Sequence, residues 1–350
     1  MKKFSDLLNE KYILNVEALK NIICENIDDS IIKRTKLKSV KKLVFIGEIK
    51  SESIELLKND NIKTYYACPS TLSFDVKLNK IEINDESKIT LSPSDCEDTI
   101  VLMRSGYSDP IIYLLTEISK MGILVINDTD SVKVSGNKFN TAEMLDKYKI
   151  SQPKYCLLTN KDATKDDTKG LETKIATLYD KVDDDTKFVC KILGGHGGKG
   201  VFLCTKSNIV SIMQCAFKLK EDVKILVQEF IPIKDGDIRV NVLSLNSKQK
   251  IFNVTMRKKE SEDFRTNLSL GNHLDNNVEL TKEQEQLAMA AAKCSGLVWA
   301  GVDLLPTEKR TYVLELNGSP GPMSDINTND AVEVNYKFYK KLIETINELC

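Results

Sequence analysis

The chain has 350 residues, 41% of them hydrophobic and 29% charged, which suits two or three globular domains and argues against a disordered chain. The 50 Lys and Arg balance the 51 Asp and Glu, and the net charge of −1 argues against a general binder of nucleic acid. No apolar run reaches the length of a membrane span or the core of a secretory signal, and the nine Cys include no C-x-x-C pair. We therefore expect a cytoplasmic protein with free thiols and no membrane partner.

The first part of the chain divides into a helical extension and a small domain. Residues 1–40 show the apolar spacing of amphipathic helix and lead into a basic stretch at 33–42, which suits either an RNA or acidic-partner contact or, in view of the neutral net charge, a solvated linker. Residues 41–130 alternate strand and helix patterns, which predicts a small parallel α/β domain. The predicted strands are 43–49, 62–68, 99–106 and 121–129, and the predicted helices are 51–60 and 109–120.

The rest of the chain divides into two further parts, 131–225 and 226–350. We predict a helix at 136–148, an exposed loop with a helix near 171–182, and strands with helices at 207–220 and 281–295. The last of these helices is the best marked, because Thr281 can cap it, Gln284 completes a capping box and Gly296 follows its end.

A glycine-rich loop, GGHGGKG at 194–200, lies between two β-rich runs. A Rossmann site needs a helix after the loop, and here VFLC reads as a strand; a Walker A loop needs Ser or Thr after the lysine, and here Gly200 follows Lys199. A hairpin loop remains, either one that closes its backbone N–H groups over phosphates or a flexible surface hairpin. Lys191 ends the preceding strand within reach of the same phosphates, and His196 reads as a loop residue.

Acidic side chains gather in the run WAGVDLLPTEKRTYVLELNGSPGP at 299–322, which reads as two strands joined by a turn at 306–310. Glu315 and Asn317 are two residues apart and so share one face of the second strand, while Leu314 and Leu316 face the other side. Asp303 lies on the partner strand within reach of that face, although the register stays open. Oxygen ligands of this kind suit magnesium bound together with substrate phosphates, and the alternative is pairing with Lys or Arg at a sheet edge.

Three arginines, Arg239, Arg257 and Arg265, fall on three consecutive strand-like segments between the glycine loop and the acidic run. On one sheet face they would repel each other unless an anion lies among them, and Arg is suited to bidentate contacts with phosphate and carboxylate. The alternative is that each one pairs with a nearby acid among Asp235, Asp237 and Glu262. Taken together, these features predict a site for phosphoryl transfer from a nucleoside triphosphate.

The order and spacing of these runs resemble the ATP-grasp superfamily and, within it, the RimK-like carboxylate–amine ligases of the alpha-L-glutamate type. The resemblance rests on VCKILGGHGGKGV, VQEFI with GDIRV, MRKK with DFRTNLSLG, AAKCSGLVWAGVDLL and VLELNGSPG, over some 135 residues. It implies an ATP-grasp fold of the α/β (α+β) class, preceded by a pre-ATP-grasp α/β domain at 41–130, while the helical extension at 1–40 matches no part of the family. It also divides the ATP-grasp part into an amino-terminal subdomain at 131–225, with the glycine-rich loop, and a carboxy-terminal subdomain at 226–350, with the metal site and a final helix.

The resemblance also implies site residues, position by position. The positions that match ATP-binding residues are Lys138, Lys191, Gly195, Gly197, Gly198, Gln228, Glu229, Phe230 and Asp237. Among these, Gln228, Glu229 and Phe230 would line the adenine pocket and Asp237 would approach the ribose. The positions that match residues serving the triphosphate and the activated carboxylate are Arg239, Arg257, Arg265 and Asn267, and those that match metal ligands are Asp303, Glu315 and Asn317.

The implied chemistry joins a carboxylate to an amine at the expense of ATP, through an acyl phosphate, with two magnesium ions expected and manganese as a substitute. The partners would be ATP, an amino-acid carboxylate and an amine or peptide acceptor, with no nucleic acid; a homo-oligomer stays open. Leu270 and Asn272 depart from the basic residue and Gly-Gly pair that the family commonly shows here, so the donated amino acid stays open, and His273 reads as a loop residue or part of a different acceptor pocket. The alternatives are a dipeptide, glutathione-type or cell-wall ligase of the same superfamily and a catalytically silent ATP-binding module.

Overall fold

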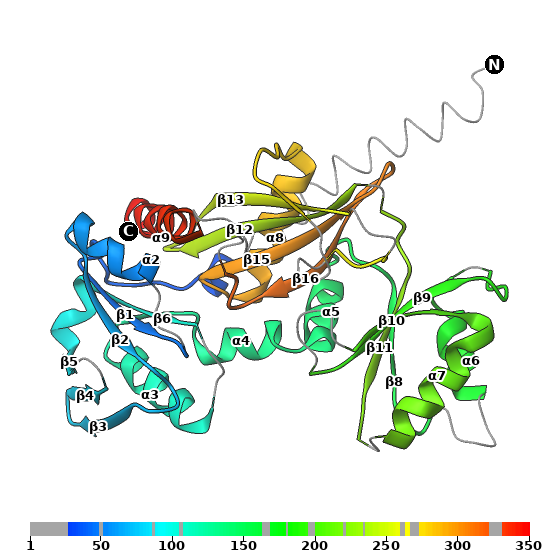
Figure 1. Ribbon diagram of the computed structural model, residues 1–350, viewed down its shortest axis with the longest axis horizontal. Coiled ribbons are helices and arrows are strands. Elements are labelled where there is room, and N and C mark those ends of the chain that lie inside the picture. The colour runs from blue at the N-terminus through cyan, green and yellow to red at the C-terminus, as the bar shows by residue number, and fades with distance from the viewer. Residues whose placement is uncertain are drawn as a thin grey trace.

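The computed structural model describes residues 27–48, 52–85, 88–104, 108–162, 169–179, 181–194, 200–219, 222–233, 235–259, 263–266, 273–321 and 331–350. The predicted helices of residues 1–26, the centre of the glycine-rich loop with Gly195, Gly197 and Gly198, and Asn267 lie outside the described residues. Figure 1 shows three sheets side by side: an amino-terminal sheet at the left, a large sheet in the middle and a small sheet at the right.

The amino-terminal sheet is parallel, as predicted for residues 41–130. Its order is β2-β1-β6-β7, from β2 (Lys63–Ala67), β1 (Lys42–Ile46), β6 (Thr99–Met103) and β7 (Leu124–Ile126). The predicted helix at 109–120 is confirmed as α3 (Asp109–Lys120), and the one at 51–60 is split into α2 (Glu52–Glu55) and the 3-10 turn η2 (Leu56–Asp60).

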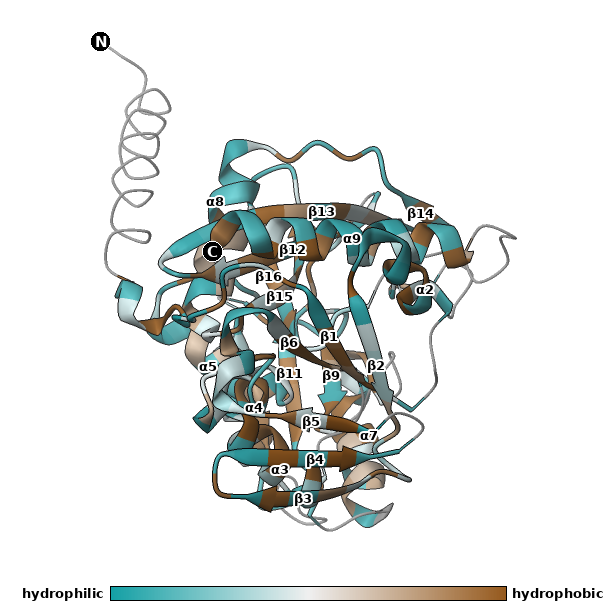
Figure 2. Cartoon of the chain, turned by 90° about the vertical axis from the view of Figure 1, so that its left-hand side faces the viewer, coloured by the Kyte–Doolittle hydropathy of each residue, from teal (hydrophilic) through white to brown (hydrophobic). Residues whose placement is uncertain are grey.

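An antiparallel sheet that the sequence analysis did not predict lies between β2 and β6 along the chain. It contains β3 (Ser73–Lys77), β4 (Lys80–Asn84) and β5 (Ile89–Leu91). In Figure 2 this sheet lies at the opposite end of the view from β13. Ile81 and Ile83 alternate with half-buried or exposed residues and are fully buried, so β4 places one face on the core of the amino-terminal domain.

Two short helices follow β7 where one was predicted. They are α4 (Thr129–Ser135) and α5 (Lys138–Lys147). The side chain of Asn137 accepts hydrogen bonds from the backbone N–H groups of Phe139 and Asn140, and this cap starts α5 as a new helix. As a consequence Lys138 is the first residue of α5.

The small sheet is antiparallel, in the order β10-β9-β11-β8. Its strands are β8 (Tyr155–Leu158), β9 (Lys187–Ile192), β10 (Val201–Thr205) and β11 (Ile225–Glu229), and helices α6 (Lys169–Ala176) and α7 (Lys206–Leu219) supply its apolar cover. The predicted domain boundary at 225/226 is wrong, since it would cut β11; the sheet itself ends at Glu229.

The large sheet carries five antiparallel strands in the order β14-β13-β12-β15-β16. They are β12 (Gly236–Leu245), β13 (Lys248–Lys258), β14 (His273–Asp275), β15 (Trp299–Pro306) and β16 (Thr311–Asn317). The capping box of Thr281 and Gln284 and the left-handed Gly296 confirm the predicted helix as α8 (Lys282–Ser295), which packs on one face of this sheet. The expectation that Arg265 lies on a strand is wrong, because residues 263–266 form a bend outside the sheet.

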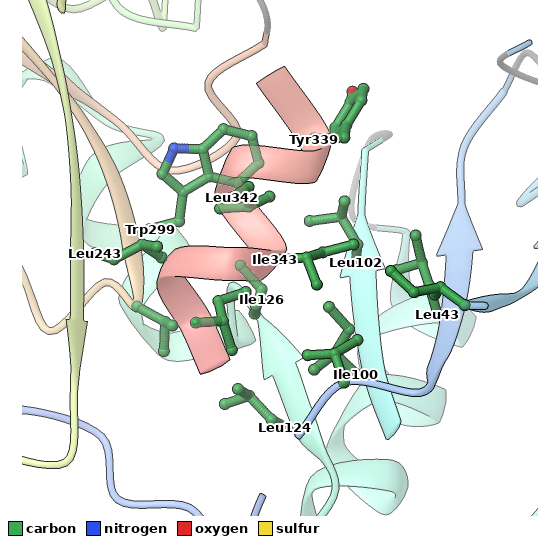
Figure 3. Packing of buried hydrophobic residues seen from close by; sticks show 14 of the residues in the cluster. Leu43, Ile100, Leu102, Leu124, Ile126, Leu243, Trp299, Tyr339, Leu342 and Ile343 are labelled. Atoms are coloured by element: carbon green, nitrogen blue, oxygen red, sulfur yellow. The ribbon is translucent and has the colours of Figure 1, made fainter. Parts of the chain in front are cut away.

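A shared hydrophobic core joins the amino-terminal sheet to the large sheet. The final helix α9 (Ala331–Leu349) inserts Leu342 and Ile343 between Leu102 of β6 and Trp299 of β15, as Figure 3 shows. Since this core draws on both sheets, the two units are packed as one body rather than joined by a linker.

Polar contacts reinforce the same junction. Asn127, which is 1% exposed, donates from Nδ2 to the carbonyl oxygens of Trp299 (2.6 Å) and Gly318 (2.7 Å) and accepts from the Trp299 N–H (2.9 Å). The basic stretch at 33–42 is partly neutralised by acids of the amino-terminal domain and of α4, which favours the interpretation as a solvated linker. These ion pairs are Lys33–Asp128 (3.0 Å), Lys38–Glu97 (2.7 Å) and Lys42–Asp95 (2.6 Å).

Two further expectations can be compared with the described part of the chain. All eight of its cysteines are free, as the absence of a C-x-x-C pair suggested. None of its helices combines the length and the apolar character that a bilayer crossing requires.

We predict that Asn127→Ala lowers the free energy of unfolding by about 2–4 kcal/mol, because it leaves buried backbone groups of Trp299 and Gly318 without their partner. Urea unfolding of the variant and of the wild type measures this difference. Asn84→Ala, at an exposed position on β4, is the matched control and should change stability by less than about 0.5 kcal/mol. Equal losses in both variants would contradict the role given to Asn127.

Candidate active site

A cavity of about 140 Å³ lies between the small and the large sheet and collects most of the predicted site residues. Strand alternation explains its small-sheet wall: Phe188 and Cys190 face the helices, so Val189 and Lys191 face the cavity together with Gln228 of the neighbouring strand. The large sheet and the bend at 263–266 supply the opposite wall. The predicted site residues that line the cavity are Lys138, Lys191, Gln228, Glu229, Phe230, Arg257, Arg265, Asp303 and Glu315.

Lys191 is the most buried cation of the cavity, with 5% of its surface exposed. Burial lowers the pKa of its ammonium group to about 8, with Lys138 adding to the effect and Glu315 and Asp303 opposing it. No carboxylate within the described ranges forms an ion pair with it. A buried ammonium group without an ion pair is stabilised by any anion that enters the cavity.

The register that the sequence left open places Asp303 directly opposite Glu315 on the paired strands β15 and β16. Asn317 Nδ2 lies 3.4 Å from Glu315 Oε1, so the two carboxylates and the amide converge as predicted. A bulge follows this pair, because Leu304 is opposite Val313 and Leu314 is left without a partner on β15. Leu314 consequently lines the cavity beside Glu315, and the expectation that it faces the other side is wrong.

Asp303 is 1% exposed and pairs with two arginines. Arg239 bonds both of its oxygens, with Nη2 2.8 Å from Oδ2, and Arg257 Nη2 lies 2.8 Å from the same Oδ2. Burial pushes the pKa of Asp303 upward, but Arg239 and Arg257 outweigh it and lower this pKa to about 2. Asp303 is therefore ionised at all ordinary pH values.

Asp237 is the second aspartate that pairs with Arg257. It is 0% exposed, lies opposite Arg257 on β12 and β13, and accepts from Arg257 Nε at 2.9 Å as well as from Nη2. The expected contact of Asp237 with a ribose is not supported by this position, because both of its oxygens serve Arg257 and it does not line the cavity. Arg239 and Asn317 are likewise absent from the lining, but they contact Asp303 and Glu315, which line it.

The arginines are neutralised by protein carboxylates in this structure. Arg239 and Arg257 pair with Asp303 and Asp237, and Arg265 pairs with Asp263 through Nε (3.0 Å) and Nη2 (2.7 Å). Pairing with acids is thus observed for all three, with Asp237, one of the acids expected, and with Asp303 and Asp263; Glu262 lies outside the described residues. Arg265 keeps part of its surface in the cavity, where an entering anion can reach it.

The end of β11 carries the predicted adenine contacts. Gln228 is 3% exposed, and its Oε1 has no hydrogen-bond partner among the described atoms. The Glu229 carboxylate accepts from the Lys154 N–H (2.9 Å), and the Phe230 N–H donates to the Tyr179 hydroxyl (2.7 Å). A buried amide oxygen without a partner on a cavity wall favours a ligand that donates a hydrogen bond to it. The N–H of Phe230 is already bonded to Tyr179, so only the carbonyl of Phe230 is available to a nucleotide base.

The donor set fits a hard divalent cation. Two carboxylates and an amide oxygen are the oxygen ligands that magnesium prefers, and a carboxylate with a pKa near 2 is already deprotonated for metal binding. Within the described ranges no cluster of three or more His, Cys, Asp and Glu gathers for a metal, so the predicted set of ligands includes the amide of Asn317 beside the two carboxylates.

Comparison with known proteins agrees with this architecture. The family model of the RimK-like ATP-grasp domain matches residues 135–345. A probable alpha-L-glutamate ligase 1 of Shewanella sp. (strain MR-4) is 31% identical over 212 residues, which are 59% of this chain and 64% of that protein. A probable alpha-L-glutamate ligase of Legionella pneumophila (strain Corby) is 33% identical over 210 residues, 59% of this chain and 63% of that protein. The match thus spans less than two thirds of the length of these relatives.

Solved structures show the same fold at lower identity. D-alanyl-alanine synthetase A from Vibrio cholerae superposes with a TM-score of 0.58 at 14% identity, covering 88% of this chain and 98% of that one. The ATP-grasp ligase PsnB in complex with a minimal precursor gives a TM-score of 0.61 at 16% identity, covering 88% and 99%. The fold is that of ATP-grasp ligases, and from the family match, which takes in the cavity and both of its sheets, the chain belongs to the RimK-like ATP-grasp family.

Proposed function

We propose that this protein is an ATP- and magnesium-dependent carboxylate–amine ligase that forms an amide bond, adding an amino acid such as glutamate to a peptide, a protein terminus or a small amine. The observation that carries the proposal is the single cavity in which a buried lysine, an unsatisfied glutamine and two carboxylates meet. Family membership and the names of the relatives in Shewanella and Legionella support the choice of reaction.

ATP would lie with its adenine at the end of β11 and its phosphates toward Lys191. The unsatisfied Gln228 Oε1 would accept the exocyclic amine of adenine, and the Glu229 and Phe230 segment would form the pocket edge. Lys138, Lys191 and Arg265 would contact the phosphates, together with the glycine-rich loop at Gly195, Gly197 and Gly198 and with Asn267. Asp303, Glu315 and Asn317 would hold magnesium, which when bound neutralises the charge on the phosphates.

The reaction would proceed in two displacements. An oxygen of the substrate carboxylate bonds to the γ-phosphorus, the bond to the β,γ-bridging oxygen breaks, and ADP leaves with that electron pair. The substrate amine then bonds to the acyl carbon, phosphate departs, and the amine loses its proton. Arg257 and Arg239 are fixed by their aspartates beside this centre, so they can stabilise developing negative charge without reorganising.

The proposal is tested by ADP formation from MgATP in the presence of pooled amino acids and candidate acceptors, with the product identified by its mass. Stimulated ADP release together with an amide product supports the ligase. ATP binding without stimulated release would favour a silent nucleotide-binding module, and a product formed only from two small amino acids would favour a dipeptide ligase.

We predict that Glu315→Gln lowers the rate of ligation by at least about a hundredfold while ATP binding weakens much less, because a metal ligand stabilises the transferring charge more than the bound nucleotide. Turnover and the Kd of a non-hydrolysable ATP analogue are measured side by side. Glu308→Gln, in the exposed turn between β15 and β16, is the control and should behave as wild type. An active Glu315→Gln enzyme would remove the metal assignment.

We predict that ATP affinity falls roughly tenfold from pH 7 to pH 9, because Lys191, with a pKa of about 8 in the free protein, must regain its proton to bind phosphate. Titration of the analogue across this range measures the effect, and Lys191→Arg should bind with a much flatter pH profile. A wild-type affinity independent of pH would contradict the role of Lys191.

We predict that Lys191→Met is more stable than the wild type at pH 7 by up to about 3 kcal/mol, because a buried ammonium group is removed. The unfolded chain binds the proton more tightly than the folded one, so the wild type gains stability as the pH rises above 8 and the difference shrinks. Urea unfolding at pH 7, 8 and 9 measures this trend. A stability difference that stays constant with pH would rule out the buried charge as its source.

A further inference from the structure

Arg104 lies at the topological switch point of the amino-terminal sheet. In the order β2-β1-β6-β7 the chain leaves β1 toward one side and continues on the other side with β6, so the switch point lies at the carboxyl ends of β1 and β6. Arg104 directly follows β6, and its N–H donates to the carbonyl of Ile46, the last residue of β1, at 2.8 Å. Open parallel sheets bind ligands outside the carboxyl ends of their strands at such a point.

At this point Arg104 contacts the large sheet and the segment that follows it. Arg104 Nη1 donates to Ser319 Oγ (3.0 Å) and to the Pro320 carbonyl (2.5 Å), and the guanidinium lies 5.5 Å from the centre of the Trp299 ring. Ser319 comes two residues after Asn317. The amino-terminal domain therefore places a fixed guanidinium beside the end of the strand that carries the candidate metal ligands.

Gly301 shows how close this guanidinium is to the charged cluster. Gly301 lies opposite Asn317, and a Cβ at this position would be 2.7 Å from Pro320 Cβ and 3.3 Å from Arg239 Nη1. Pro320 is thus in contact with Arg104 through its carbonyl and adjacent to Arg239 through its ring. Arg104 and Arg239, the arginine that holds Asp303, thus both lie near Pro320.

The charge of Arg104 is balanced differently from that of the other arginines at the site. Arg239, Arg257 and Arg265 each bond an aspartate, whereas the partners of Arg104 in the described part of the chain are neutral oxygens, among them Ser319 Oγ and the Pro320 carbonyl. A guanidinium has five N–H donors in a fork that matches a carboxylate. A half-buried arginine that has no acidic partner among the described residues therefore favours an anionic ligand at the switch point.

We propose that Arg104 binds a carboxylate of the amino-acid substrate, the one that is not consumed in the reaction, and thereby positions that substrate between the amino-terminal and large sheets. This inference rests on the proposed ligase function, which supplies a substrate with a surviving carboxylate. Arg104 acts here as a binding residue for the amino-acid substrate, separate from the ATP cavity, which it does not line.

The test compares Arg104→Gln and Arg104→Lys with the wild type in ADP formation. MgATP is kept saturating, and L-glutamate and the other amino acids of the panel are varied one at a time. For the amino acid that stimulates the wild type, Arg104→Gln should raise KM between about tenfold and a hundredfold, the size expected for a charge-assisted hydrogen bond, and Arg104→Lys should fall in between. The KM for ATP should stay within about twofold.

Two controls separate binding from a structural role. In one control, the carboxylate that is not consumed is replaced by a carboxamide. This analogue should react equally poorly with the wild type and with Arg104→Gln, since the group that Arg104 recognises is gone. Arg310→Gln removes another arginine that stacks on an aromatic ring, Tyr312, at 4.5 Å but far along the sheet, and it should leave all constants unchanged.

The outcomes are distinct. An unchanged KM for the amino acid in Arg104→Gln would show that Arg104 only ties the two domains together. The same conclusion would follow if Arg104→Gln had a lower Tm, a higher KM for ATP and a lower rate with the carboxamide than the wild type. Failure of every amino acid to stimulate the wild type would overturn the ligase proposal, and the inference with it.

Discussion

The site depends on a buried alternation of charges across the large sheet: Asp237, Arg257, Asp303 and Arg239, in that order of contact. Removing any of these groups from water is unfavourable by itself, and only mutual pairing with good geometry offsets that loss. The cross-strand register makes the pairing possible, since Arg257 is opposite Asp237 and Arg239 is opposite Asp303. The consequence is a rigid, ionised Asp303 beside a cavity whose other carboxylate, Glu315, is held by the next strand.

The same face of the large sheet performs two tasks along its length. Near one end of β12 it presents Asp237 and Arg239 to the site, and further along Leu243 enters the core shared with α9 and the amino-terminal sheet. Trp299 does the same on β15, two residues before Gly301 and four before Asp303. Docking of the amino-terminal domain and alignment of the charged residues therefore depend on the same two strands, so a change in their register would disturb both.

Local patterns in the sequence predicted what local physics decides. Alternation in LELN predicted the shared face of Glu315 and Asn317, and the capping box predicted where α8 begins. The residues that escaped prediction depend on partners distant in sequence. The bulge that turns Leu314 into the cavity arises only when β15 pairs with β16, and the burial of Asp237 follows from its position opposite Arg257, which is 20 residues away. The sheet at 73–91 was missed although SFDVK and KIEIN alternate polar and apolar residues on both sides of a turn, which is a local pattern typical of a hairpin.

The two carboxylates of the site are not equivalent, and this decides which of them can report on metal binding. Asp303 balances two arginines, so converting it to Asn would leave Arg239 and Arg257 buried with too little negative charge, and lost activity could reflect lost structure. Glu315 forms no ion pair with any described residue and is bonded only by the amide of Asn317, which makes its charge available to a cation. Its neutral isostere therefore tests the proposed metal site with the sheet intact, and the arginine pairs explain why Asp303 is ionised in this structure.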